Sequence, residues 1–290
     1  MIEKIKEHAA RLLKEGSVEL VLAYKRATDG LSACPAFVRH PEDVESLIWD
    51  SLCVYNLSNF LPGLRGKKVA IVAKGCDIRA IVGLVQEHQV DRKEVLVIAV
   101  ECVGVLDSTV FGEPPKDRKL QAKCRSCKVH SPKFFDILVK DERLGEKVVD
   151  EAEPYSEVDE LERLSPEERF DFWKSEFSKC IKCYACRQAC PLCYCPTCVA
   201  DQTSPRWLSR EARFLGNFSW NVTRAFHLAG RCIDCGECER VCPVGIPLRK
   251  LNKKLEKYIL ETYGYTAGVD SEAKPPLQDF RPEDKGDFIL

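Results

Sequence analysis

Cysteine is the residue whose number and spacing in this chain point most directly to chemistry. Two runs share the spacing Cys-x2-Cys-x2-Cys-x3-Cys-Pro, and they begin at Cys180 and Cys232. In the bacterial ferredoxin pattern the first three thiolates of a run hold one cubane 4Fe-4S cluster, and the fourth crosses to the other cluster. We therefore predict one cluster on Cys180, Cys183, Cys186 and Cys242, and a second on Cys232, Cys235, Cys238 and Cys190.

Zinc is the alternative metal, because zinc ribbons also use paired Cys-x2-Cys motifs. A zinc site has no use for the third cysteine of each run or for the repeated Cys-Pro ending.

Three further cysteines directly follow the first run; they are Cys193, Cys195 and Cys198. They either complete another cluster with a distant cysteine such as Cys53, or are buried thiols that shield the first cluster. The sequence leaves both alternatives open, and it assigns no role to Cys34.

A third set of cysteines is expected at one edge of a sheet. Cys76 follows the apolar run 68–73 and Cys102 follows the apolar run 94–100, and we predict both runs as parallel strands. Open α/β sheets bind their ligands beyond the carboxyl ends of such strands. With Cys124 and Cys127, these residues make up a candidate four-thiolate site. The alternatives are a zinc atom, or a core cysteine at Cys102 beside an unrelated Cys-x2-Cys pair.

The elements that position these residues are those of an α/β N-terminal domain with a small parallel sheet. We expect strands over residues 18–23, 68–73 and 94–100 and helices over 3–14, from near Pro41, and over 78–87. The last two strands and the helix between them form a right-handed crossover unit. The acidic residues 141–162 are expected to be a solvated connector.

The C-terminal half is expected to be an α+β two-cluster ferredoxin-like domain with a helical insert. Ser165, Pro166 and Glu168 form a capping-box pattern that predicts a helix to about Ser178. A long helix over 209–229 should connect the two runs, and Pro247 should start a last helix to about 262, before a Pro-rich tail. The expected domains are 1–150 (α/β iron–sulfur), 151–178 (acidic linker and helix), 179–250 (dicluster ferredoxin-like) and 251–290 (C-terminal helix and extended tail).

Side chains of these two helices have expected roles around the clusters. The aromatic residues are expected to pack around the clusters and limit the access of water; they are Phe214, Phe218, Trp220 and Phe226. His227 either donates to a cluster sulfur or gates a proton, or it is a packing residue on a helix face. The basic residues of the last helix are expected to form a solvated face; they are Arg249, Lys253, Lys254 and Lys257.

The composition limits the kinds of partner. The chain has 290 residues, of which 45% are hydrophobic and 31% charged, as is ordinary for a soluble globular protein. Its net charge of -1 offers no electrostatic footprint for nucleic acid or for an anionic membrane surface.

We find no signal peptide and no apolar run of about 20 residues that could span a membrane, so we expect a cytoplasmic protein. In a reducing cytoplasm, 17 cysteines indicate metal ligation rather than disulfides.

Two resemblances to known families follow from these motifs. Residues 17–140 resemble the first part of the beta-subunit family of deazaflavin-coenzyme-reducing hydrogenases and formate dehydrogenases. The motifs that carry this resemblance are PAFVRHPE, VAIVAKGCDIRAIVGL, VIAVECVG and CRSCKVHSPKFFDILV. The second half resembles dicluster 4Fe-4S ferredoxin proteins encoded beside hydrogenases, formate dehydrogenases and heterodisulfide-reductase modules, through CIKCYACRQACPLCYC and RAFHLAGRCIDCGECERVCP.

The first resemblance implies cofactors as well as a fold. The family carries a flavin and a 4Fe-4S cluster, which implies a third cubane at Cys76, Cys102, Cys124 and Cys127 and makes FAD a candidate cofactor. Two features depart from the family. The turn before Cys76 is Lys-Gly rather than Thr-Pro, and the ferredoxin unit replaces the long catalytic segment. Gly75, Asp77 and Arg79 are candidate contacts for a phosphate at a helix start, or else solvated charge around a cluster.

These observations predict an iron–sulfur subunit that relays single electrons through cubanes in series. Its expected partners are protein subunits of an anaerobic oxidoreductase complex: a flavoprotein, or a subunit of hydrogenase, formate dehydrogenase or heterodisulfide-reductase type. The chain itself then needs no substrate site. This interpretation has two alternatives. One is a flavin-containing subunit that itself oxidises or reduces a deazaflavin or nicotinamide, and the other is a zinc-bound scaffold protein.

Overall fold

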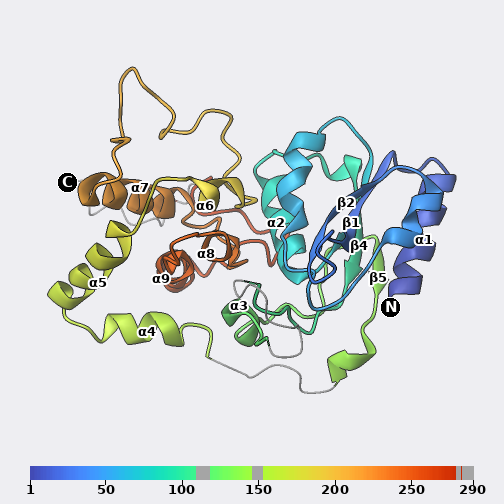
Figure 1. Cartoon of the computed structure of the whole chain (residues 1–290), viewed down its shortest axis with the longest axis horizontal. Helices are drawn as coiled ribbons and strands as arrows, with labels where there is room; N and C mark the ends of the chain where they lie inside the picture. Colours follow the sequence, from blue (N-terminus) through green and yellow to red (C-terminus); the bar gives the residue numbers. More distant parts are fainter. Residues whose placement is uncertain (109–117, 146–152, 279–281, 283–290) are drawn as a thin grey trace.

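The computed structural model has a five-stranded sheet in its N-terminal half and a helical C-terminal half (Figure 1). It describes residues 1–108, 118–145, 153–278 and 282. The strand order across the sheet is β2-β1-β3-β4-β5. The strands are β1 (Leu20–Arg26), β2 (Ala33–Val38), β3 (Val69–Ala73), β4 (Val95–Val100) and β5 (Ile137–Val139).

The middle of the sheet is parallel. β3 lies between β1 and β4 and is parallel to both, β5 is parallel to β4, and only the edge strand β2 is antiparallel to its neighbour β1. Val69 pairs with Val95 and Ala73 with Ala99, so β3 and β4 end at the same edge of the sheet. The expected parallel neighbours are thus confirmed, within a sheet that is mixed as a whole. Their runs of β-branched residues suit strands that are covered on both faces.

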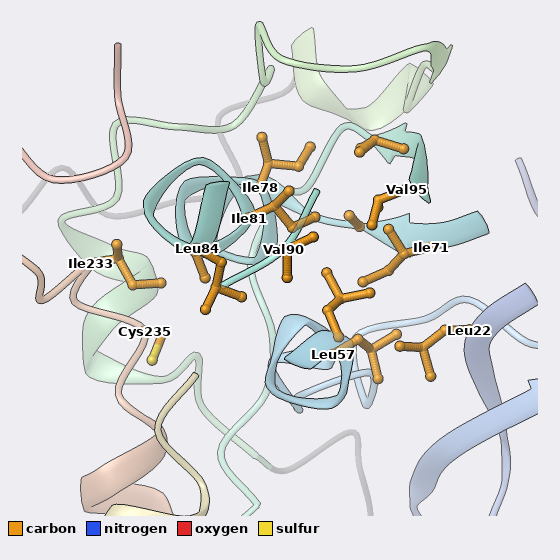
Figure 2. Close-up of a cluster of buried hydrophobic side chains, with 14 of the residues drawn as sticks. Leu22, Leu57, Ile71, Ile78, Ile81, Leu84, Val90, Val95, Ile233 and Cys235 are labelled. Carbon is orange, nitrogen blue, oxygen red and sulfur yellow. The ribbon is translucent and has the colours of Figure 1, made fainter. Parts of the chain in front are cut away.

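Two helices cover the two faces of the sheet. Helix α1 (Ile2–Lys14) packs on one face, where its buried residues join a core with β1, β3 and β4. Helix α2 (Gly75–Gln86) packs on the other face, and Figure 2 shows Ile81 and Leu84 of this helix in the core that also contains Ile71 of β3. Their apolar spacing of three residues places them on one side of the helix.

The second core extends into the C-terminal half. Ile233 and Cys235, from the second cysteine run, belong to the same cluster of buried side chains as Leu84 (Figure 2). The N-terminal half and this run therefore share one hydrophobic core, which fixes the position of the run relative to the sheet.

The other helices lie mostly in the C-terminal half. They are α3 (Ala122–Arg125), α4 (Ser156–Glu162), α5 (Pro166–Ser178), α6 (Ala185–Gln188), α7 (Phe214–His227), α8 (Glu237–Arg240) and α9 (Leu248–Tyr263), with 3₁₀ helices at Pro41–Ser46, Leu57–Leu64, Arg92–Glu94 and Glu142–Gly145. No helix within the described ranges is both long and apolar enough to cross a membrane.

Several predictions of secondary structure are confirmed and others are corrected. Helix α5 has the predicted capping box, with the Ser165 hydroxyl accepting from the Glu168 N–H, and it ends at Ser178. The segment after Pro41 is a 3₁₀ helix, and the connecting helix begins at Phe214 instead of 209. Residues 153–278 form helices and loops without a strand, so the expected α+β character of this part is not found there. Of the tail, the structure describes 274–278 and 282.

The basic residues of α9 do not form a solvated face. Arg249 and Lys253 are buried, with 5% and 7% of their surface exposed. Lys257 pairs with Asp159 and Glu162 of α4 at 2.8 and 2.6 Å. The prediction of a solvated face was wrong because the acidic residues of α4, expected to be a free connector, dock against this helix.

Candidate metal centres

Four cysteines from three separate segments of the N-terminal half line one cavity. Cys76 lies at the start of α2, directly after β3, and Cys102 follows β4. Cys124 lies on α3 and Cys127 just after it. The cavity has a volume of about 300 Å³, and all four residues form part of its wall. The structure thus brings together the four residues of the third predicted set, at the carboxyl edge of the parallel strands.

Backbone amides point at the sulfur atoms of this site. Three of the four sulfurs accept a backbone N–H at 3.4 Å: Cys102 from Gly104, Cys124 from Val105 and Cys127 from Val129. Hydrogen bonds of this kind stabilise ligating thiolates and tune the potential of the cluster that they hold. The site therefore has a feature that cluster ligands need and that apolar core thiols do not.

Two glycines allow the segments of the site to approach each other. A Cβ on Gly75 would lie 2.0 Å from the carbonyl oxygen of Val129, so the loop after Cys127 rests directly on the start of α2. Gly104 has φ +109°, and a Cβ there would lie 3.3 Å from the Cβ of Cys124. Any larger residue at Gly75 would push the Cys-x2-Cys segment away from Cys76.

The thiols of this cavity are hard to ionise without a positive partner. Burial raises the pKa of Cys76 to about 12, and burial raises the pKa of Cys102 to about 11, although the Lys74 ammonium acts against both shifts. Metal binding requires the thiolate forms and supplies the charge that stabilises them. Buried thiols that line a cavity and accept backbone N–H groups therefore fit a thiolate-ligated cluster.

The predicted phosphate contacts are occupied by protein groups. The carboxylate of Asp77 is fully buried, and it accepts the N–H of Leu57 at 2.8 Å, the N–H of Lys74 at 3.0 Å and the Lys74 ammonium at 2.9 Å. Arg79 donates to the carbonyl of Ala267 at 2.9 Å. Gly75 and Arg79 line the cavity beside the cysteines. A phosphate contact at these residues stays a prediction.

The first ferredoxin set lies together around Cys186. Burial raises the pKa of this thiol, and the neighbouring thiols of Cys180, Cys242 and Cys183 raise it further. Cys242 belongs to the second run and packs in one core with Cys180 and Cys186 of the first. This proximity allows the predicted crossing, and ligation by Cys242 stays a prediction. Cys183 is exposed, whereas Cys186 is buried.

The second ferredoxin set lies together in the same way. Cys190 and Cys232 pack against the same hydrophobic core that contains Cys235. Burial raises the pKa of Cys235, and the thiol of Cys190 adds to this shift. Burial also raises the pKa of Cys238 to about 12, again with a contribution from Cys190. The fourth cysteine of each run therefore lies with the first three cysteines of the other run.

The two runs repeat the same backbone conformation. Lys182 and Asp234 occupy equivalent positions and have φ of 53° and 54°. Tyr184 and Gly236, also equivalent, have φ of 57° and 70° and precede the short helices α6 and α8. Residues other than glycine rarely adopt this left-handed conformation. Its repetition shows that the two runs share one backbone geometry.

A buried arginine lies between the two ferredoxin sets. Arg224 of α7 is 4% exposed and donates from Nη2 to the carbonyl oxygen of Cys186 at 3.0 Å. Burial alone would lower its pKa, but the charges of Cys238, Cys190 and Cys193 raise the pKa well above its ordinary value. The Arg224 Nε is buried and has no hydrogen-bond partner among the residues that the structure describes.

A buried lysine lies between the N-terminal site and the second set. Lys123 is 7% exposed, and its ammonium donates to the carbonyl oxygen of Cys235 at 2.5 Å. Burial alone would lower its pKa, but the charges of Cys76, Glu237, Cys124 and Cys235 raise it. Sequence reasoning missed both cations. The one available signal for Lys123 was its place next to a Cys-x2-Cys pair.

The three extra cysteines line a second cavity, of about 250 Å³. A hydrogen bond between the thiols of Cys193 and Cys190 lowers the pKa of Cys190 and raises that of Cys193. Cys193 therefore lies next to a residue of the second set. Cys53 lies beside Asp50, whose N–H donates to its sulfur at 3.4 Å, and it is not among the residues that line this cavity.

The expected surroundings of the clusters are found in part. Trp220 is 3% exposed and packs with Cys186 and Cys238, as predicted for a shielding aromatic residue. Phe226 is 61% exposed, so its predicted place beside the clusters was wrong. It lies on the outer side of α7, whose inner side carries Trp220 and Arg224. His227 is exposed at the end of α7 and lines the second cavity.

Among the described residues, no three His, Cys, Asp or Glu side chains are grouped so that they could hold a single metal ion. A zinc ion draws its sulfur ligands to about 2.3 Å from one point. Cys76, Cys102, Cys124 and Cys127 instead line a cavity of about 300 Å³.

Comparisons with known proteins agree with this arrangement. Residues 179–247 match the family model of the 4Fe-4S dicluster domain. The F420-dependent formate dehydrogenase subunit beta of Methanocaldococcus jannaschii is 25% identical to the chain, over 92% of this chain and 91% of the relative. The F420-dependent formate dehydrogenase 1 subunit beta of Methanococcus maripaludis is also 25% identical, over 92% of this chain and 90% of the relative. Over most of its length the chain is thus similar to formate dehydrogenase beta subunits.

The likeness to these beta subunits runs through both halves of the chain, because each alignment covers 92% of it. The resemblance seen in the motifs of residues 17–140 is therefore supported, and so is the presence of a 4Fe-4S domain near the C-terminus. Taken together, the beta-subunit relatives and the dicluster domain make this chain an iron–sulfur protein of the electron-transfer kind.

Proposed function

We propose that the chain relays single electrons through three cubane 4Fe-4S clusters between partner subunits of an oxidoreductase complex. The N-terminal cluster is held by Cys76, Cys102, Cys124 and Cys127, and the two ferredoxin clusters by the crossed sets described above. The observation that carries the proposal is the arrangement of the N-terminal site. Four thiols from separate segments line one cavity, and three of them accept backbone N–H groups.

The three clusters lie in a fixed order in this proposal. The N-terminal cluster adjoins the second ferredoxin cluster, because Lys123, which precedes Cys124, bonds to the carbonyl of Cys235. The second ferredoxin cluster adjoins the first, because Cys238 of the second set packs in one core with Cys186 of the first, and Arg224 donates to the carbonyl of Cys186. The first cluster has the exposed Cys183 at its edge, so this is the end at which a partner exchanges electrons.

The protein groups have defined tasks in such a relay. A bound cubane supplies a one-electron couple whose potential depends on its protein surroundings. The cysteine thiolates hold the iron, the backbone amides of Gly104, Val105 and Val129 donate to their sulfurs, and Trp220 keeps water away from the ferredoxin sites. Each of these groups influences either the potential of a cluster or the access of solvent to it.

The partners are proposed from the relatives. Their names identify beta subunits of an F420-dependent formate dehydrogenase. We propose that this chain also works beside a subunit that carries out two-electron chemistry, of formate dehydrogenase, hydrogenase or heterodisulfide-reductase type. The cubanes would then pass the two electrons on one at a time.

A flavin-containing subunit is the second candidate function. The observation that favours it comes from the relatives. Both align with 92% of the chain, and both are named as F420-dependent. In that case the chain itself would exchange a hydride with the deazaflavin. Gly75 and Arg79, which line the N-terminal cavity, are the residues proposed to approach a phosphate of the flavin.

A reductive titration under strict exclusion of oxygen tests the proposed relay. The purified chain is titrated with a low-potential reductant, and the electrons taken up per chain are counted while the visible absorbance is followed. The relay predicts about three electrons, one for each cubane, and a loss of the broad iron–sulfur absorbance without a flavin spectrum. About five electrons, with a flavin spectrum, would move the protein to the second candidate function. An uptake of about two, or a colourless zinc protein, would contradict the proposal.

A further inference from the structure

Lys123 connects the N-terminal site to the second ferredoxin run. It precedes Cys124 on α3, and its side chain lines the cavity of the N-terminal cysteines. Its ammonium reaches across and donates to the carbonyl oxygen of Cys235 at 2.5 Å. The lysine therefore lies between the two cysteine sets: it lines the cavity of one, and its ammonium bonds to the backbone of the other.

The contact between Lys123 and the Cys235 carbonyl depends on residues of both segments. Gly236 follows Cys235 and has φ +70°, and a Cβ at this position would lie 3.1 Å from Cδ of Lys123. The missing side chain of Gly236 leaves room for the aliphatic part of the lysine, which is 7% exposed. A long side chain that is fixed along its whole length loses much conformational freedom, so its position has a cost that a solvated lysine would avoid.

Within the described part of the chain, no carboxylate forms an ion pair with the Lys123 ammonium, so the cysteines are the neighbouring groups on which its charge can act. Glu237 is an acidic neighbour, but its carboxylate is held by Arg240 through contacts of 3.0 and 2.6 Å. Among the residues that the structure describes, the hydrogen-bond acceptor of the ammonium is the uncharged carbonyl of Cys235. A buried positive charge that is not consumed by a carboxylate acts strongly on negative groups nearby, because the protein interior screens it weakly.

We propose that Lys123 raises the reduction potentials of both the N-terminal cluster and the second ferredoxin cluster, and so keeps this pair matched for electron transfer. The inference rests on the proposed function, since it needs both clusters. When one electron leaves either cluster and enters the other, the donor is oxidised and the acceptor is reduced, and no bond or proton changes place. The ammonium stabilises the extra negative charge on whichever cluster holds the electron.

Three variants separate the charge of Lys123 from its structural role. Lys123→Gln keeps a donor for the carbonyl of Cys235 and removes the charge. Lys123→Arg keeps the charge and a donor. Lys119→Gln is the matched control. It removes a charge from an exposed residue, and Lys119 lines a neighbouring pocket to which Lys123 also contributes.

The experiment is a redox titration of the complete chain, followed by electron paramagnetic resonance, with iron measured on each sample. Lys123→Gln should disfavour reduction of two of the three clusters by about tenfold each, which is a shift of about 59 mV to more negative potential for a one-electron couple. The third cluster should keep its potential. Lys123→Arg should restore the wild-type values, and Lys119→Gln should leave all three unchanged.

The outcomes distinguish this inference from the proposed function. The Cys76→Ser variant, which lacks the N-terminal cluster, identifies the signal of that cluster. If the wild type contains three clusters and Lys123→Gln shifts none of them, or only one, the inference is wrong and the relay stands. If Lys123→Arg fails to restore the potentials while iron is retained, the charge is not the cause and the inference is also wrong. If the wild type contains only two clusters, both proposals fall.

Discussion

The guanidinium of Arg224 donates a hydrogen bond to the carbonyl oxygen of Cys186 at 3.0 Å from a position between the two ferredoxin cysteine sets. Helix α7, which carries this arginine, belongs to the insert between the two runs. The insert thus provides a buried cation where the two clusters are proposed to adjoin. Lys123 has the corresponding place between the second ferredoxin set and the N-terminal site.

Loss of the charge of Arg224 should affect the two ferredoxin clusters together. In Arg224→Gln we expect both potentials to fall, by roughly 59 mV for each tenfold change in the reduction equilibrium, because the buried guanidinium stabilises the reduced forms. The potential of the N-terminal cluster should stay unchanged. A redox titration checks this pattern, with Arg224→Lys as the variant that keeps the charge. A shift of the N-terminal cluster instead would contradict the order of the clusters.

The crossing of the fourth cysteines can be tested in a protein with one ferredoxin cluster removed. In a background where Cys232, Cys235 and Cys238 are replaced by serine, the remaining ferredoxin cluster should depend on Cys242 from the other run. Adding Cys242→Ser should therefore abolish its signal in electron paramagnetic resonance, and adding Cys190→Ser should leave it. The opposite result would show that each run holds its own cluster.

The N-terminal site can be removed alone. Cys76→Ser should lower the iron content from about twelve to about eight per chain, because one four-iron cluster loses a ligand. Cys34→Ser is the control, since Cys34 lies on the edge strand β2 and outside the described cavity wall. Equal iron in Cys76→Ser and the wild type would argue against a cluster in this cavity.

Because Gly75 lies so close to the backbone of Val129, a larger residue at Gly75 should destabilise the fold. Gly75→Ala places a Cβ 2.0 Å from the carbonyl oxygen of Val129, so the loop after Cys127 must move. We expect a loss of about 1–3 kcal/mol in the free energy of unfolding, as for overpacked sites, together with lower iron occupancy of the N-terminal site. Denaturant unfolding and iron analysis measure the two effects.

Gly63→Ala is the matched control for this substitution, since a Cβ at Gly63 has no atom within 4 Å among the residues described. This variant should lose much less stability than Gly75→Ala and should keep its iron. If both variants behave alike, the contact with Val129 does not limit the packing at α2.

The sequence predicted the parts of this site that follow from local patterns. The strands before Cys76 and Cys102 were recognisable from their β-branched runs, and parallel pairing places their ends at one edge. The repeated cysteine spacing predicted the two ferredoxin sets in the same way. Both kinds of inference depend on neighbours within a few residues, which sequence shows directly.

The missed features depend on contacts between distant segments. Lys253 was expected in solvent because its helix is basic, but Asp234 pairs with it at 2.9 Å from nineteen positions earlier in the chain. Arg224 lies in no local motif that marks it as a buried cation, and the one local signal for Lys123 was its place next to a Cys-x2-Cys pair. The edge strand β2 was also missed, since Pro35 and Cys34 break the usual apolar alternation of a strand.

The number of cubanes in this chain can be counted from iron and acid-labile sulfide per chain. The protein is purified without oxygen and both elements are measured against its concentration. We expect about twelve irons and about twelve sulfides, from three four-iron clusters. About eight of each would rule out the N-terminal cluster and the proposed three-cluster relay, and zinc in place of iron would rule out all three clusters.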